Sequence, residues 1–165
     1  MTTDLKPIAA RAVTDGDTVL ATVDVAGPPE RAFRALNTDE VERWWGSANT
    51  YRMVDWTSDL RVGGHWHVGV RFVGGDTVLP AGGAFLELDA PRKVVLTRIY
   101  EFDHPTLGRR ETTVTYLCDP IETGTRVTVR HEGFGSSEAA HEHAYGWERM
   151  LGWLGHYLES DSISA

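Results

Sequence analysis

The chain has 165 residues, of which 41% are hydrophobic and 24% charged, a composition that predicts one globular domain and argues against disordered, collagenous and membrane-spanning classes. Its formal net charge of −8 argues against nucleic acid or an anionic membrane surface as the main partner, because both would repel the protein. With no apolar run of spanning length, no secretory signal layout, and Cys118 as the single cysteine, we expect a cytoplasmic protein that does not insert into membranes.

The chain begins with a strand pattern. Apolar and polar side chains alternate over residues 18–25, which predicts the first strand. Residues 8–13, followed by the turn signal Asp15-Gly16, could form a short strand before it or a loose arm, because Asp-Gly supplies a positive φ at little steric cost. We therefore describe residues 1–16 as an N-terminal arm or short extra strand.

Two short helices are expected next. The Pro-Pro-Glu sequence at residues 28–30 fits the first turn of a helix that runs through Leu36, because that turn needs no amide donor. Asn37 with Glu40 three residues later resembles a capping box, and it predicts a second helix that Gly46 can end. The two helices together would form a small lid-like unit.

From residue 51 onward the pattern predicts strands at short spacing, namely 51–55, 64–73, 83–89, 93–102, 110–118 and 125–134. Their connections are too short for parallel crossovers, which need about a dozen residues, so the sheet should be an antiparallel meander. Residues 138–158 change to a three- and four-residue period, which predicts a long helix capped by Ser136 or Ser137.

Six motifs give the sequence a family resemblance. They are AGPPERAFRAL at 26–36, WWG at 44–46, LRVGGHW at 60–66, GTR at 124–126, HEGF at 131–134 and GW at 146–147. With the order of elements, they resemble the START-like (SRPBCC) superfamily, in its branch similar to activators of the heat-shock-protein ATPase (AHSA-type). The resemblance covers residues 17–159 and leaves residues 160–165 as a tail.

The resemblance implies a helix-grip α+β fold, in which a curved antiparallel sheet of about six or seven strands wraps around the long C-terminal helix. Two short helices would follow the first strand. The resemblance also implies a cavity between sheet and helix, which different members of the superfamily use for lipids, hormones, polyketides or no known ligand. Because fold does not determine function, the ligand stays open.

Histidine is the first candidate for chemistry, because it titrates near neutrality and binds metals. His65 and His67 share one face of a predicted strand, but the apolar set occupies the opposite face, so both should point to solvent. His141-Glu142-His143 does not match the zincin pattern. We therefore predict neither a metal site nor a cofactor.

His131 and His143 are expected nearer the cavity. His131 follows Val127 and Val129 by even steps, so it should point inward. There it is either a core histidine bonded to a backbone carbonyl, or a polar anchor or proton donor in the cavity. His143 lies at the edge of the apolar stripe of the last helix, as a half-exposed flank residue or facing the same cavity.

The sequence holds six tryptophans. Trp44, Trp45, Trp66 and Trp147 would gather between sheet and helix, either as plain core or as the wall of an apolar pocket. Tyr116 could place a hydroxyl in that pocket.

The direction of two further residues stays open. Arg98 and Tyr100 share the parity of Val94 and Leu96. The residues of the opposite face compete with them for the inward side, namely Val95, Thr97 and Ile99. The residues predicted to line a ligand pocket are Trp44, Trp45, Trp66, Tyr100, Tyr116, His131, His143, Trp147 and Leu151.

Glycines interrupt the predicted C-terminal helix at Gly146, Gly152 and Gly155, where each costs about 1 kcal/mol relative to alanine. Close approach to a strand or room for a ligand would compensate for that cost. Close packing is the more frequent of these two reasons.

Three functions remain as hypotheses. The first is a module that binds a small hydrophobic or aromatic molecule between sheet and helix. The second is a polyketide cyclase/aromatase-like enzyme, in which His131, with Tyr116 or Arg98, moves protons. The third, implied by the resemblance, is a chaperone-associated protein similar to the heat-shock-protein ATPase activators. Nucleophilic catalysis finds no support, because the sequence has no Gly-x-Ser-x-Gly elbow. The resemblance also implies that a homodimer is possible, since members of the superfamily often pair through sheet or helix surfaces.

Overall fold

The computed structural model describes residues 9–164, with side chains through residue 161. Eight strands form one antiparallel sheet in the order β1-β2-β8-β7-β6-β5-β4-β3. The strands are β1 (Arg11–Asp15), β2 (Thr18–Val25), β3 (Tyr51–Ser58), β4 (His65–Phe72), β5 (Val78–Asp89), β6 (Lys93–Tyr100), β7 (Thr112–Ile121) and β8 (Gly124–Glu132). The helices are α1 (Pro29–Asn37), α2 (Val41–Trp44) and α3 (Ser137–Ser164).

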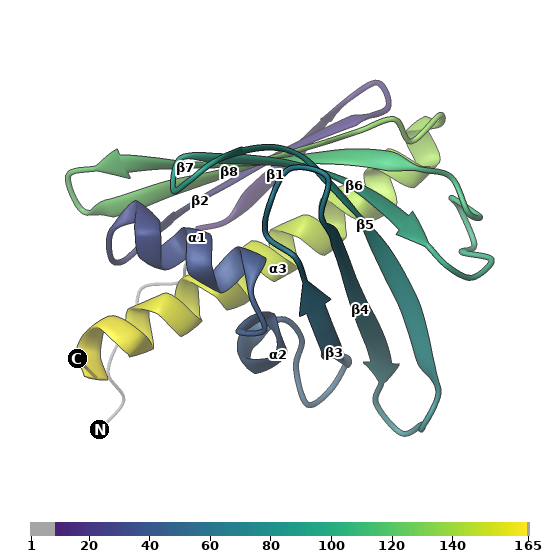
Figure 1. Cartoon of the computed structure of the whole chain (residues 1–165), viewed down its shortest axis with the longest axis horizontal. Helices are drawn as coiled ribbons and strands as arrows, with labels where there is room; N and C mark the ends of the chain where they lie inside the picture. The colour runs from purple at the N-terminus through teal and green to yellow at the C-terminus, as the bar shows by residue number, and fades with distance from the viewer. Residues whose placement is uncertain (1–8, 165) are drawn as a thin grey trace.

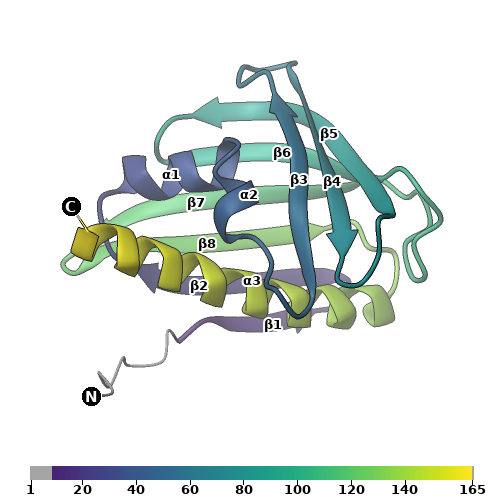
Figure 2. The ribbon, with the colours of Figure 1, turned by 90° about the horizontal axis from the view of Figure 1, so that it is seen from below.

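The sheet curves around α3. Figure 1 shows it arching over α3, with α1 and α2 on the same side of the sheet as α3. In Figure 2, seen from below, α3 runs along β2 while α1 and α2 lie beside it. The predicted helix-grip α+β fold is confirmed, with one or two strands more than expected. None of the described helices has the length and apolar character needed to cross a membrane.

The extra strand is β1, which the sequence left open. It pairs antiparallel with β2 through the turn at Gly16, whose φ of 62° lies in the left-handed region. Residues 1–8 of the predicted arm lie outside the described residues. The alternation predicted for β2 is also confirmed, because one of its faces is buried: Val19, Ala21, Val23 and Val25.

The long helix follows its predicted pattern at the start and exceeds it at the end. The Ser136 hydroxyl accepts a hydrogen bond from the Ala139 backbone N–H at 3.2 Å, which confirms the expected cap. The apolar stripe is buried and contains Ala140, Ala144, Trp147, Leu151, Leu154 and Leu158. The helix continues through Ser164, so residues 160–164 extend it where a tail was expected.

The predicted capping box is wrong. Asn37 is the last residue of α1, and its side-chain amide donates to the Phe33 carbonyl at 2.9 Å. The second helix begins at Val41 without a side-chain cap. The carboxylate of Glu40 is drawn away from its own helix by positive partners on α1.

Glu40 joins the short helices to α3. Its carboxylate accepts hydrogen bonds from Arg31 Nη2 at 2.8 Å, Arg34 Nε at 2.8 Å and the Tyr157 hydroxyl at 2.6 Å. Burial alone would raise the pKa of this carboxyl, but the three donors outweigh burial and hold its pKa below the usual value. Arg31 also pairs with Asp161 at 2.7 Å, which ties α1 to the far end of α3.

We predict that Glu40→Gln lowers the free energy of unfolding by about 2 kcal/mol at pH 7, within the range of hydrogen bonds to charged groups. Because the folded pKa is lowered, this contribution is present above the unfolded value of about 4.3 and is lost as the pH falls through the folded value. Urea denaturation at pH 7 and pH 3 tests the prediction. The difference in free energy of unfolding between variant and parent should be smaller at pH 3 than at pH 7, and an unchanged difference would contradict the prediction.

Candidate functional site

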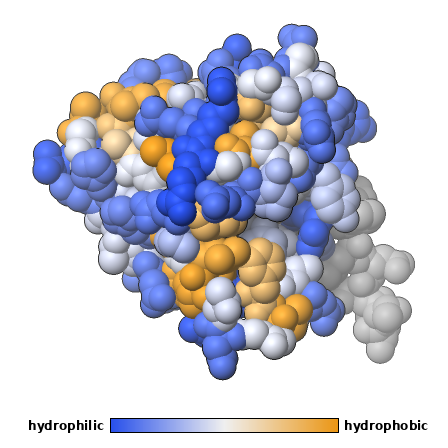
Figure 3. All heavy atoms as spheres, turned by 90° about the vertical axis from the view of Figure 1, so that its right-hand side faces the viewer, coloured by the Kyte–Doolittle hydropathy of each residue, from blue (hydrophilic) through white to orange (hydrophobic). Residues whose placement is uncertain are grey.

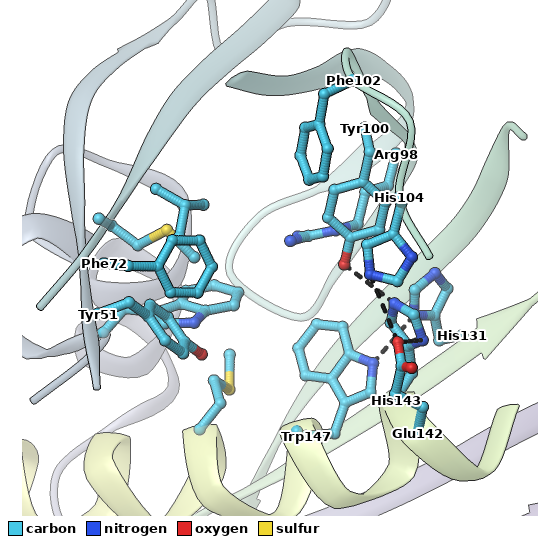
Figure 4. A pocket seen from close by; sticks show the side chains of 15 residues that line it. Tyr51, Phe72, Arg98, Tyr100, Phe102, His104, His131, Glu142, His143 and Trp147 are labelled. Carbon is cyan, nitrogen blue, oxygen red and sulfur yellow. Dashed lines mark hydrogen bonds and ion pairs between the residues drawn. The ribbon is translucent and has the colours of Figure 1, made fainter. Parts of the chain in front are cut away.

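A pocket of about 220 Å³ lies between the concave face of the sheet and α3 (Figure 4). Its wall includes apolar and aromatic side chains from β3, β4 and α3, namely Tyr51, Met53, Val70, Phe72, Trp147 and Met150. Its polar end is built by the end of β6, the loop that follows and the first turns of α3, which contribute Tyr100, His104, Glu142 and His143. Figure 3 views the side of the molecule where β6 ends and α3 begins, and apolar side chains gather there below a hydrophilic band.

The pocket brings together part of the predicted set, namely Trp45, Tyr100, His131, His143 and Trp147. An adjoining hollow of about 20 Å³ shares Trp45 and Arg98 with the pocket, and Trp66 and Tyr116 line this smaller hollow. Apart from Trp44, the predicted aromatic residues are therefore divided between two neighbouring spaces.

Trp44 and Leu151 lie outside both hollows, in the packed core. Trp44 is buried, and its indole N–H donates to the Ala35 carbonyl at 3.0 Å. Its ring stacks on that of Trp45, with 5.4 Å between the ring centres. Leu151 is fully buried one turn beyond Trp147 on α3. Trp44 therefore supports the pocket wall from behind through Trp45, whereas Leu151 belongs to the core.

The structure settles the direction of the two β6 residues that the sequence left open. Arg98 and Tyr100 both line the pocket, on the same face of β6 as the buried Val94 and Leu96. Thr97 lies on the other face, where its hydroxyl accepts a hydrogen bond from the Ala84 backbone N–H at 2.9 Å. The neighbouring strand β5 therefore satisfies the polar group of Thr97.

Arg98 is a buried charge among aromatic rings. It is 9% exposed, and among the described residues it forms no ion pair with a carboxylate. Its Cζ lies 5.8 Å from the ring centres of Trp45 and Trp66 and 5.3 Å from that of Tyr100. Burial alone would lower the pKa of Arg98, but the oxygens of Tyr100 and neighbouring tyrosines outweigh burial, so the pKa lies above the usual value. The guanidinium is charged at physiological pH.

His131 holds α3 against the sheet. The indole of Trp147 donates to His131 Nδ1 at 2.9 Å, so Nε2 carries the ring proton and donates to Thr112 Oγ1 at 2.7 Å. The Thr112 hydroxyl then donates to the Arg98 carbonyl at 3.2 Å. Burial, followed by the charge of Arg98, lowers the pKa of His131 well below its usual value. His131 is therefore a neutral core histidine, bonded to an indole and a hydroxyl in place of the expected backbone carbonyl.

His143 is the acceptor that orients Tyr100. Its Nδ1 donates to the Ala139 carbonyl at 2.9 Å, which leaves Nε2 to accept from the Tyr100 hydroxyl at 2.9 Å. Burial, together with the charge of Arg98, lowers the pKa of His143 to about 4 against the opposing effect of the Ala139 hydrogen bond. The ring is neutral at pH 7.

A cluster of His104, Glu142 and His143 at the polar end was not foreseen. Their possible ligand atoms lie within 4.8 Å of one another. However, His104 Nδ1 accepts the backbone N–H groups of Thr106 and Leu107 at 3.2 and 3.3 Å, so Nε2 carries the ring proton and faces Glu142 at 3.4 Å. A metal on Nε2 would force that proton onto Nδ1, against two donors. We interpret the cluster as a hydrogen-bonded rim.

The sequence matches the family described as "Activator of Hsp90 ATPase homolog 1-like protein" over residues 26–159. The chain belongs to this family. A search of curated proteins found no match.

Solved structures with similar folds come from several bacteria. A Chromobacterium violaceum protein is 22% identical with a TM-score of 0.74, over 87% of this chain and 97% of that one. A Rhodobacter sphaeroides protein is 18% identical with a TM-score of 0.75, over 92% and 99%. A Mycobacterium smegmatis protein is 18% identical with a TM-score of 0.69, over 88% and 96%. At these identities the similarity establishes the fold alone.

In this member of the family, strand parity could have identified more of the wall. Tyr51 and Met53 are two residues apart and share one face of β3. Val70 and Phe72 share the face of Trp66 on β4. Phe102 keeps the parity of Tyr100 within the strand predicted over residues 93–102, so the same signal was available for it, whereas the loop residue His104 follows no such period.

Close packing against a strand does not explain Gly146 and Gly152 of α3. A Cβ placed on Gly146 would meet no atom within 4 Å, and the same holds for Gly152. Gly146 lines the pocket, whereas Gly152 lies beside a separate surface depression near Trp153. The glycine at position 146 therefore leaves open volume next to the pocket wall.

We predict that the folded protein gains stability as the pH rises from about 4 to about 6.5. The pKa of His143 is about 4 in the folded protein, against about 6.5 in an unfolded chain, so the unfolded chain binds more protons in this interval. Burial of His131 acts in the same direction. Denaturation of the parent and of His143→Gln at pH 7 and pH 5 tests this. The free energy of unfolding should change less between pH 5 and pH 7 in the variant than in the parent. An equal change in both proteins would contradict the lowered pKa of His143.

Proposed function

We propose that the protein binds a small hydrophobic or aromatic molecule in the pocket between the sheet and α3. The observation that carries this proposal is the unfilled volume. Protein interiors are close-packed, with few voids larger than a water molecule, whose share of liquid volume is about 30 Å³. The pocket, at about 220 Å³, is several times larger, and although it is partly open to solvent its lining includes the buried side chains of Trp45, Met53 and Met150. It is smaller than the roughly 300 Å³ at which drug-sized sites begin, so we expect a small ligand.

The chemistry of the wall favours an aromatic ligand. Trp147 meets Trp45 at 5.9 Å between ring centres, and its indole N–H is already bonded to His131. Its ring face therefore offers contact area without an unmet polar group. Aromatic rings pair in offset or edge-to-face arrangements that contribute about 0.5 to 1.5 kcal/mol beyond the burial of area.

The cyclase/aromatase-like alternative has less support. Both ring nitrogens of His131 are bonded to protein groups, so the ring has no site left for a proton from a substrate. Burial raises the pKa of the Cys118 thiol to about 12, which argues against a thiolate nucleophile. The chaperone-associated alternative rests on the description of the family alone.

A substitution in α3 tests the proposal. Gly146→Leu would place a side chain in the open volume of the pocket, and replacing a helix-interior glycine should also favour the helix by roughly 1 kcal/mol. We predict that naphthalene, titrated into the parent protein and followed by ¹⁵N–¹H NMR, shifts signals of β3, β6 and α3. Gly146→Leu should bind it at least about tenfold more weakly while unfolding at the same or a higher temperature.

Gly152→Leu is the matched control. It makes the same change in the same helix, with no atom within 4 Å of the new Cβ, but outside the pocket. It should bind naphthalene as the parent does. Equal binding by both variants would contradict the location of the site. If neither naphthalene nor a wider panel of small aromatic and aliphatic compounds binds the parent, the proposed function is wrong.

A further inference from the structure

Arg98 is costly to bury. Removing a charge from water carries a large free-energy penalty unless an opposite charge or several hydrogen bonds compensate. Among the described residues Arg98 has no carboxylate partner within 4 Å, and its polar side-chain contact is with Tyr100. Rings of Trp45, Trp66 and Tyr100 surround it, and each cation–π contact contributes only about 0.5 to 2 kcal/mol.

The surroundings add no negative charge to the pocket near Arg98. Tyr51 and Tyr116 are neutral at physiological pH, because burial raises the pKa of both. Glu142 is the carboxylate that lines the pocket, but it faces His104 at 3.4 Å, and its side chain is 45% exposed. Among the described residues, the pocket therefore holds one buried positive charge that has no carboxylate partner.

The guanidinium is directed at the open volume. Figure 4 shows the Arg98 side chain passing behind the Tyr100 ring toward the space between Tyr100 and Phe72. No fully buried side-chain nitrogen or oxygen among the described residues lacks a hydrogen-bond partner. The guanidinium nitrogens without a protein acceptor are therefore not fully buried, and the pocket and the small adjoining hollow are the two spaces that Arg98 lines.

We infer that the ligand of the proposed pocket is a small apolar or aromatic carboxylic acid, whose carboxylate pairs with Arg98 while its body contacts the aromatic wall. This inference rests on the proposed function and names its ligand class. A carboxylate matches the planar fork of a guanidinium and supplies one negative charge. A phosphate carries more charge and needs more donors than the single cation here, so it fits this site less well.

The test compares two ligands of nearly equal shape, naphthalene-2-carboxylate and naphthalene-2-carboxamide, by calorimetric titration at pH 7. The parent protein should bind the carboxylate about 10- to 100-fold more tightly, as expected for a charge-assisted hydrogen-bonded pair. Arg98→Met should lose this preference and bind the carboxamide within about threefold of the parent. Its unfolding temperature should equal or exceed that of the parent, because the variant no longer buries an unpaired charge.

Arg149→Met is the matched control. Arg149 also lies against aromatic rings, with its Cζ 5.4 Å from the Tyr145 ring centre and 5.2 Å from that of Trp153, but it lines the separate surface depression. Its replacement should leave the preference for the carboxylate intact. Arg98→Lys keeps the charge without the planar fork, so its preference should be intermediate.

The outcomes distinguish failure of the carboxylate inference from failure of the proposed ligand pocket. Equal binding of the two ligands by the parent, or a preference that survives in Arg98→Met, overturns the carboxylate inference and leaves the apolar pocket standing. Displacement of the bound carboxylate by millimolar inorganic phosphate also overturns it, because the site would then be a general anion site. If neither ligand binds the parent and the neutral panel also fails, both the inference and the proposed function fall.

Discussion

The hydrogen-bond chain from Trp147 through His131 to Thr112 determines how α3 sits on the sheet. All three side chains are buried, and the chain ends on the carbonyl of Arg98. It fixes the rotation of α3, because an indole N–H can donate in one direction only. With Trp147 held in this way, the preceding glycine borders the pocket and Leu151 packs into the core. The pocket is therefore a consequence of where the helix is anchored.

The same series of hydrogen bonds also connects the fold to the electrostatics of the pocket. Thr112 lies opposite Arg98 in the β6–β7 pairing, so the anchor of α3 and the buried guanidinium occupy neighbouring positions of the sheet. Desolvation, and with it the charge of Arg98, lowers the pKa of His131 and of His143. Neutral imidazoles then act as fixed acceptors and donors. This arrangement leaves one positive charge in a space with aromatic walls, a combination that suits recognition better than proton transfer.

The sequence predicted the architecture because that information is local and periodic. The alternation of β2, the turn after β1 and the stripe of α3 follow from repeats of two residues and of about 3.6 residues. The inward direction of His131 followed from the same parity. The capping box at Asn37 failed because long-range partners on α1 and α3 compete for Glu40, and no local pattern records them.

The site was harder to predict than the fold. Strand parity could not decide whether Arg98 or Thr97 points toward the pocket. That direction depends on the hydrogen bond between the Thr97 hydroxyl and β5. His104 lies on a loop without a period, and Leu151 belongs to the same helical stripe as Trp147 yet falls outside the pocket. A stripe identifies the buried face of a helix, whereas the empty part of that face depends on the strands opposite it.

The most direct test of the account is native mass spectrometry of the protein purified from its own host, with extraction and identification of any molecule that co-purifies. We expect one small, largely apolar molecule per chain, released on denaturation and absent from Gly146→Leu. A protein that is empty as purified, and stays empty after exposure to small aromatic and aliphatic compounds with and without a carboxylate, would contradict the claim that the pocket is a ligand site.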